Sequence, residues 1–188
     1  MTAPVSAPMS IKKPVYLLVP LLAGAVVAVA LGVYANQHKA TFRPIWTGPF
    51  ETMLGMKVWL TVAAMVFAVF QLVTALWMYG KLGVRAPGGL GAVHRATGLI
   101  AVVLTLPVAF HCLWALGLNF TNIEARVLAH ALFGCVFYGA FVAKVLTLHS
   151  KRVPGWALPW VGGLLFTTLV GAGLTSAAWY FGAIGVPS

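Results

Sequence analysis

Acidic side chains are almost absent from this sequence. Glu51 and Glu124 are the only two, against twelve lysines and arginines. Charged residues of both signs make up 7% of the chain, whereas a soluble domain carries about a quarter. Hydrophobic residues make up 61%, and the mean hydropathy is +0.97. A soluble domain of 188 residues could not bury so much apolar surface, but a bilayer accommodates it, so the composition predicts an integral membrane protein.

Cysteine is scarce too, and its scarcity excludes further functions. Cys112 and Cys135 are the two cysteines, and no C-x-x-C-H sequence occurs, so covalent attachment of a c-type haem is not expected. Both lie inside apolar runs, where we interpret them as small buried side chains, with a disulfide between them as the alternative. The net charge of +10 does not indicate nucleic-acid binding, because the basic residues stand singly at the ends of apolar runs.

Five apolar runs are long enough to cross a bilayer, and they predict an all-α membrane protein with five transmembrane helices. The first run is longer than the apolar region of a secretory signal, about 7–15 residues, so we expect it to be retained. Pro107 is predicted to kink the third helix. The predicted segments are a cytoplasmic tail at 1–14, helices at 15–35, 56–79, 92–118, 125–149 and 158–181, and a long aromatic loop at 36–55.

The distribution of lysine and arginine predicts the orientation in a bacterial cytoplasmic membrane. Cytoplasmic loops carry more of these residues than outer loops do. With the N-terminus in the cytoplasm and the C-terminus outside, eight of them lie on the inner side and four on the outer side, where both glutamates also lie. The inner residues are Lys12, Lys13, Lys81, Arg85, Arg95, Lys144, Lys151 and Arg152, and the outer residues are Lys39, Arg43, Lys57 and Arg126.

Four of the five histidines fall in the third and fourth predicted helices. Because these helices run in opposite directions, His94 and His149 lie at the inner level, and His111 and His130 lie at the outer level. The two spacings of 17 and 19 residues correspond to about 26 and 29 Å of helix. Both lengths approach the ~30 Å thickness of the hydrocarbon region. The sequence therefore predicts one level-matched histidine pair in each leaflet.

The rotation between the histidines also matches. At about 100° per residue, the side chain turns by about −100° over the spacing of 17 and by about +100° over the spacing of 19. In antiparallel helices, these opposite rotations direct the two histidines of each pair toward the same side. Ionisable side chains inside a membrane are candidates for function, and one imidazole from each side is a suitable pair of axial ligands for haem iron. We therefore predict one or two non-covalent haem b groups between the third and fourth helices.

These two helices must stand apart to admit a ring, because helices in direct contact pack at about 8–10 Å. The second and fifth helices would complete a four-helix haem-binding bundle. Two further kinds of residue are predicted to bind the cofactor. Gly98 and Gly134 each follow a histidine by one turn and leave room for the ring edge. The cations Arg95, Arg126 and Lys144 can pair with the propionates.

Simpler interpretations remain open for the individual residues. A single membrane histidine is often a hydrogen-bonded packing residue, and His149 also fits an interfacial position beside Lys151. His38 follows the first helix in a polar loop, where we expect a solvated or interfacial role, with a reserve ligand for the outer site as the alternative. Met78 is the alternative ligand at the inner level.

The stretch HRATG at 94–98, with His111, His130 and His149 on two helices, resembles the transmembrane di-haem cytochromes b. The b561-type cytochromes and the ferric-reductase-like membrane domains are the nearest in pattern, and the resemblance implies axial ligation by the four histidines. The spacings are longer than is usual there, so one haem between His111 and His130 is the alternative to two. From about residue 56 onward, the chain also resembles a small bacterial membrane family of unassigned function.

These features favour an electron-transfer subunit over a stand-alone enzyme. No G-x-G-x-x-G sequence with a ribose-binding acid occurs, so electrons must be exchanged with partners. We expect a quinol or another donor, and an outer partner docked on 36–55 and 118–126. That partner would be a periplasmic redox protein, such as a Rieske or copper protein, or a larger respiratory complex. The alternative is a non-redox membrane anchor or assembly subunit. A metal or proton relay is disfavoured, because such relays usually contain Asp or Glu.

Overall fold

The structure, a computed structural model, describes residues 13–119, 121 and 123–187. Within these ranges there is no strand, and five helices are long and apolar enough to cross a membrane. The predicted all-α fold with five membrane-spanning helices is therefore confirmed, and the chain is a multi-pass membrane protein. Lys12 and most of the predicted tail 1–14 lie outside the described residues.

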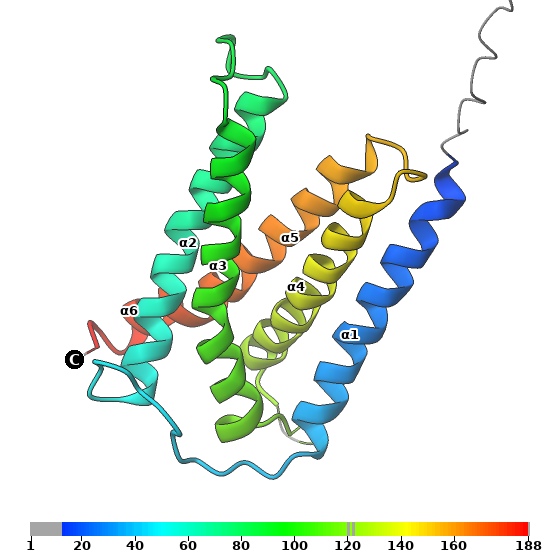
Figure 1. The fold of residues 1–188 in the computed structure, drawn as a ribbon. Helices are drawn as coiled ribbons and strands as arrows, with labels where there is room; N and C mark the ends of the chain where they lie inside the picture. The colour runs from blue at the N-terminus through cyan, green and yellow to red at the C-terminus, as the bar shows by residue number, and fades with distance from the viewer. Residues whose placement is uncertain (1–12, 120, 122, 188) are drawn as a thin grey trace, which may run out of the picture.

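The five spans run alternately up and down (Figure 1). A short 3-10 turn, η1, precedes α1. A π-helical turn follows α3 and another follows α5; these two turns are η2 and η4. The bounds are η1 Pro14–Leu17, α1 Leu18–Gln37, α2 Met53–Met78, α3 Leu90–His111, η2 Cys112–Leu116, α4 Ala125–His149, α5 Ala157–Gly173, η4 Leu174–Ala178 and α6 Trp179–Ala183.

Four of the helices share one core. α2 packs with α3, and α4 packs between α1 and α5. α5 also reaches α2, and its C-terminal part crosses toward the first turns of α2 in Figure 1. One cluster of packed buried side chains joins them, with one residue from each of α2–α5 and none from α1; these residues are Ala68, Val102, Phe137 and Leu169. α2–α5 therefore form a four-helix core, and α1 lies outside it against α4.

The two histidine-bearing helices, α3 and α4, are not closely packed on one another, unlike the pairs above. They meet through long side chains near the middle of the bundle, where the Tyr138 hydroxyl donates to Thr105 Oγ1 at 2.8 Å. Tyr138 also packs against the buried core. This contact closes the centre of the bundle and separates its two ends.

Small residues hold α1 against α4. Gly24 and Gly139 lie so close that a Cβ on either would overlap the carbonyl oxygen of the other. A Cβ on Gly139 would also come within 3.1 Å of the Ala28 Cβ. In a membrane, helix association depends on close packing of this kind, because lipid tails are as apolar as the side chains. These glycines therefore determine which face of α4 receives α1.

Replacing Gly139 by alanine is expected to destabilise the protein by about 1–3 kcal/mol, because the added methyl group forces the two backbones apart. Gly32→Ala is the matched control, since its Cβ would meet only the Cys135 Sγ, at 4.0 Å. Unfolding of the purified proteins in detergent, followed by circular dichroism, measures both. Equal stability of the two variants would show that the glycine contact does not hold α1.

Candidate functional site

Each end of the bundle carries one histidine from α3 and one from α4. We name the two ends after their α3 histidine: the His111 end also holds His130, and the His94 end also holds His149. All four rings share one feature, which is a hydrogen bond at Nδ1. The partners are Pro107 O at 2.8 Å for His111, Ala172 O at 3.1 Å for His130, Val145 O at 2.8 Å for His149 and Thr74 Oγ1 at 2.7 Å for His94.

These contacts determine which ring nitrogen carries the proton. A carbonyl oxygen only accepts, so Nδ1 is the protonated nitrogen in the three rings that contact a carbonyl. The Thr74 hydroxyl has one proton and lies within reach of both Phe70 O, at 2.9 Å, and His94 Nδ1, at 2.7 Å, so this contact does not assign the His94 tautomer. In the three rings that contact a carbonyl, Nε2 keeps its lone pair, which is the form in which a neutral imidazole binds iron.

At the His111 end, the residue that follows the α3 histidine contacts the α4 histidine. His111 is 1% exposed, and its Nε2 has no hydrogen-bond partner. The next residue, Cys112, places its Sγ 3.9 Å from His130 Nε2. A buried polar atom without a partner is uncommon in native proteins, so the His111 Nε2 is suited to receive a ligand.

The thiols add no further ligand cluster. Cys112 and Cys135 are both free, so the disulfide that the sequence left open does not form. In the described ranges, no three His, Cys, Asp or Glu side chains gather as a site for a metal ion. Axial ligation of a haem needs only two side chains, one on each face of the ring.

Both π-helical turns flank the histidines of the His111 end. η2 begins directly after His111, and η4 begins two residues after Ala172. A π turn breaks the regular ladder and leaves carbonyl groups available to other donors, and such turns often occur at functional sites. Ala172 O accepts from His130 Nδ1 and also from Thr175 Oγ1, at 3.2 Å. The backbone of α5 is therefore shaped to orient the His130 ring.

A cation lies on one side of His130. On the Nδ1 side, Thr175 Oγ1 lies 3.4 Å from the ring, and Arg126 donates to Thr175 O at 3.0 Å. Arg126 was predicted at this site from the sequence.

The His94 end is arranged differently. Gln71 of α2 donates to His94 O at 2.8 Å, and its Oε1 would lie 2.9 Å from a Cβ on Gly98. The space predicted for a ring edge at Gly98 is therefore occupied by an amide from α2. Lys144 of α4 lies near enough to His94 for their charges to interact. His149 is exposed, and within the described ranges no hydrogen bond or ring contact joins it to His94.

The remaining predicted residues have distinct surroundings. A Cβ on Gly134, one turn after His130, would meet nothing within 4 Å, so space is present there. Arg95 is exposed at the His94 end. Met78 also lies at that end, with its Sδ 3.9 Å from the position of a Cβ on Gly91.

His38 lies at the His111 end within a row of aromatic rings. Its ring stacks between Tyr34, at 5.2 Å between centroids, and Trp114, at 4.5 Å. Trp114 stacks on Phe110 at 6.1 Å, and Phe110 meets the ring of His111 edge-on at 5.4 Å. His38 thus lies in an aromatic cluster at the end of α1, where its Nε2 is buried without a hydrogen-bond partner. Its role as a reserve ligand stays a prediction.

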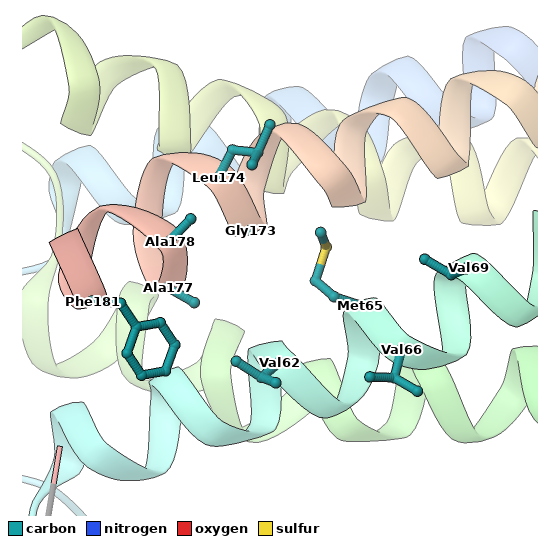
Figure 2. A pocket seen from close by; sticks show the side chains of 9 residues that line it. All are labelled: Val62, Met65, Val66, Val69, Gly173, Leu174, Ala177, Ala178 and Phe181. Atoms are coloured by element: carbon teal, nitrogen blue, oxygen red, sulfur yellow. The ribbon is translucent and has the colours of Figure 1, made fainter. Parts of the chain in front are cut away.

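Two apolar pockets lie away from the histidines. One, of about 280 Å³, opens between α2 and the C-terminal part of α5, where Figure 2 shows Met65 projecting toward Gly173. The other, of about 430 Å³, lies between α1 and α4, and its lining includes Cys135 and the amides of Asn36 and Gln37. No histidine lines either pocket, so neither is the candidate site.

Comparison with known proteins shows a family but no cytochrome. A search of the curated proteins and a search of the solved structures find no match to this chain. The resemblance to the cytochromes b therefore stays a prediction, whereas the resemblance to a family of unassigned function has a counterpart. The chain belongs to DUF6529, a family of unknown function, whose profile matches residues 17–188.

Proposed function

We propose that this protein is a membrane cytochrome of the b type that holds one haem b between His111 and His130. The observation that carries the proposal is the common state of the imidazoles. His111 and His130 each direct Nδ1 to a backbone carbonyl, which leaves the lone pair on Nε2; the Nε2 of His111 has no partner, and that of His130 faces the Cys112 thiol. The two rings belong to different helices, α3 and α4, and the residue after His111 contacts His130.

The chain's own residues would position the group. Hydrogen bonds from Nδ1 to Pro107 O and Ala172 O orient the two rings and increase the basicity of Nε2. Gly134 leaves open space one turn from His130. Arg126 supplies a cation at the same end. A bound haem supplies reversible one-electron chemistry, and the protein supplies ligation, position and exclusion of water.

The alternative form of the proposal adds a second haem at the His94 end. His94 is supported by the Thr74 hydroxyl of α2, and Lys144 and Arg95 offer cations for propionates. His149 is exposed and makes no described contact with His94, which favours the single-haem arrangement. A pyridine-haemochrome determination per polypeptide decides between them: a value near one supports the single site, and a value near two supports both pairs.

The proposed role is electron transfer in the cytoplasmic membrane of a bacterium. With the N-terminus in the cytoplasm, the His111 end faces outward, and the loop 36–55 lies beside it. This loop is fastened to η2 by a hydrogen bond from Phe42 N to Ala115 O at 2.9 Å, and it exposes Phe42 and Trp46 at 74% and 56%. We propose that a periplasmic redox protein of the Rieske or copper type, or a larger respiratory complex, docks there, and that a quinol is the donor.

The same features disfavour a metal or proton relay. Such a relay needs polar groups through the middle of the membrane. The centre of this bundle is closed by apolar core residues and the contact of Tyr138 with Thr105. The only two acids of the sequence, Glu51 and Glu124, are exposed near the helix ends.

The experiment that tests the proposal is a difference spectrum of the purified protein, reduced with dithionite minus oxidised, from cells supplied with haem. The expected result is a red protein with absorption bands of a b-type cytochrome. A short-chain quinol added to the oxidised protein in lipid nanodiscs should produce the same bands. A colourless protein from haem-replete cells would overturn the proposal and favour the alternative of a non-redox anchor or assembly subunit.

A further inference from the structure

We propose that Arg126 is a positioning residue, which orients the His130 ring by holding the π turn η4, in place of the propionate contact that the sequence predicts for it. The inference rests on the proposed function for its effect on haem, because His130 is one of the two proposed ligands. The orientation of the ring is a property of the chain itself and can be measured separately.

Arg126 and His130 reach the same part of the fifth span. They are four residues apart in α4, so their side chains leave the helix from one face, one turn apart. Arg126 donates to Thr175 O at 3.0 Å, and His130 Nδ1 lies 3.1 Å from Ala172 O. Ala172 and Thr175 are three residues apart. The two side chains therefore contact neighbouring turns of α5 and η4.

Arg126 contacts the π turn at two points. Thr175 is the second residue of η4, and Trp179 is the first residue of α6, which follows η4 directly. The guanidinium carbon of Arg126 lies 3.7 Å from the centroid of the Trp179 ring, which is a cation–π contact. A π turn is rare in proteins, so contacts from outside the helix are needed to favour it. Arg126 supplies two such contacts.

Thr175 connects Arg126 to the ring. Its carbonyl accepts from Arg126, and its hydroxyl lies 3.4 Å from His130 Nδ1. The hydroxyls of Thr175 and of Ser176, the next residue of η4, also reach Ala172 O, at 3.2 and 2.6 Å. The acceptor of the Nδ1 proton therefore lies among groups whose positions depend on η4. A turn that relaxed toward a regular α-helix would move these groups and weaken the hydrogen bond from His130.

The charge of Arg126 is already compensated within the chain. The Glu124 carboxylate lies 3.6 Å from the guanidinium, in addition to the contacts with Thr175 O and the Trp179 ring. A cation with a carboxylate, a carbonyl and an aromatic ring around it does not need a propionate as its partner. This arrangement favours the positioning role.

The first measurement needs no haem. Full-length protein prepared without haem, with ¹⁵N-labelled histidine and in nanodiscs of neutral lipid, gives ring ¹⁵N signals that distinguish a protonated nitrogen from one with a lone pair. His130→Ala identifies the signals of that ring. Wild type should show His130 protonated at Nδ1, and Arg126→Met should shift it toward protonation at Nε2. His149, whose Nδ1 contacts Val145 O within α4, is the internal control and should not change.

The second measurement separates positioning from a propionate contact. It is a spectroscopic titration with hemin and with hemin dimethyl ester, which has the same ring and iron but no carboxylate. Arg126→Met should weaken the binding of both probes by about tenfold, as expected when the support of a metal ligand is removed. Arg126→Lys keeps a cation and an N–H donor and should recover most of the affinity. A loss confined to hemin would assign Arg126 to a propionate and overturn the inference.

Two further variants complete the test. Arg85→Met removes the same charge from the exposed turn between α2 and α3 and should change neither measurement. Trp179→Leu removes the ring beside the guanidinium and should shift the His130 signals in the same direction, so it carries the test if Arg126→Met does not fold. Unchanged His130 signals in both variants at η4 would overturn the inference. If wild type binds neither probe, the proposed function fails, whereas the ¹⁵N signals still decide whether Arg126 orients the ring.

Discussion

Replacing either His111 or His130 by alanine is expected to remove the haem, lowering the haem content of the purified protein at least about tenfold. In the proposed site, each histidine would supply one of the two bonds from the protein to the iron of a group without covalent attachment. Neither change leaves another imidazole in reach on the same helix, because His94 and His149 lie at the other end of the bundle. The measurement is haem per polypeptide by the pyridine-haemochrome method.

His38→Ala is the control for this pair of variants. Its ring lies at the same end and stacks on Trp114, but it belongs to the aromatic row at the end of α1. We expect it to keep the full haem content and at most lose some stability. Retention of haem by both His111→Ala and His130→Ala, or its loss from His38→Ala alone, would contradict the assignment of the ligands.

Gly134→Leu is expected to prevent haem binding while leaving the haem-free fold intact. A Cβ at this position meets nothing within 4 Å, so the stability of the haem-free chain should change by no more than about 0.5 kcal/mol. The larger side chain would occupy the space beside His130 in which the ring is proposed to lie. Overpacking of this kind should weaken hemin binding about tenfold or more.

Gly162→Leu is the matched variant, since a Cβ there also meets nothing within 4 Å but α5 carries no proposed ligand. Hemin titration and detergent unfolding of both variants give the two readouts. Wild-type hemin affinity in Gly134→Leu would show that the space beside His130 is not the space of the ring.

The helices could be predicted from the sequence, because a bilayer imposes a minimum length on each apolar run. α4, bounded by Glu124 and Ser150, occupies the predicted range 125–149. α2 begins three residues earlier than predicted, at Met53, because Thr52 Oγ1 accepts a hydrogen bond from Gly55 N at 2.9 Å and caps the helix. Because of this earlier start, Lys57 lies one turn inside α2 and not at its N-terminus.

The pairing of the helices could not be predicted in the same way. Between membrane helices no hydrophobic force selects the partner, so pairing depends on local shape and on a few polar contacts. The contact of Gly24 with Gly139 places α1 on α4, but each glycine is one of several in its region of the sequence. The Gln71 amide fills the space at Gly98, and only the three-dimensional pairing of α2 with α3 shows this.

The two candidate ligands could be proposed from the sequence, but the groups that accept hydrogen bonds from their rings could not. Residue spacing indicated that His111 and His130 share a level, because depth in the membrane follows directly from helical rise. The acceptors of their Nδ1 protons are backbone carbonyls, Pro107 O and Ala172 O, which no side-chain pattern reveals. The π turn near Ala172 depends on how α5 packs, and a single sequence carries little signal for it.

In the proposed cytochrome, the Nε2 atoms of two histidines bind one iron. Electron–nuclear double resonance of the oxidised protein, grown with ¹⁵N-labelled histidine, observes those nitrogens directly. The account predicts a low-spin ferric haem coupled to two histidine ¹⁵N ligands, with the couplings absent after His130→Ala. A preparation without haem, or a haem coupled to one histidine nitrogen or none, would contradict it.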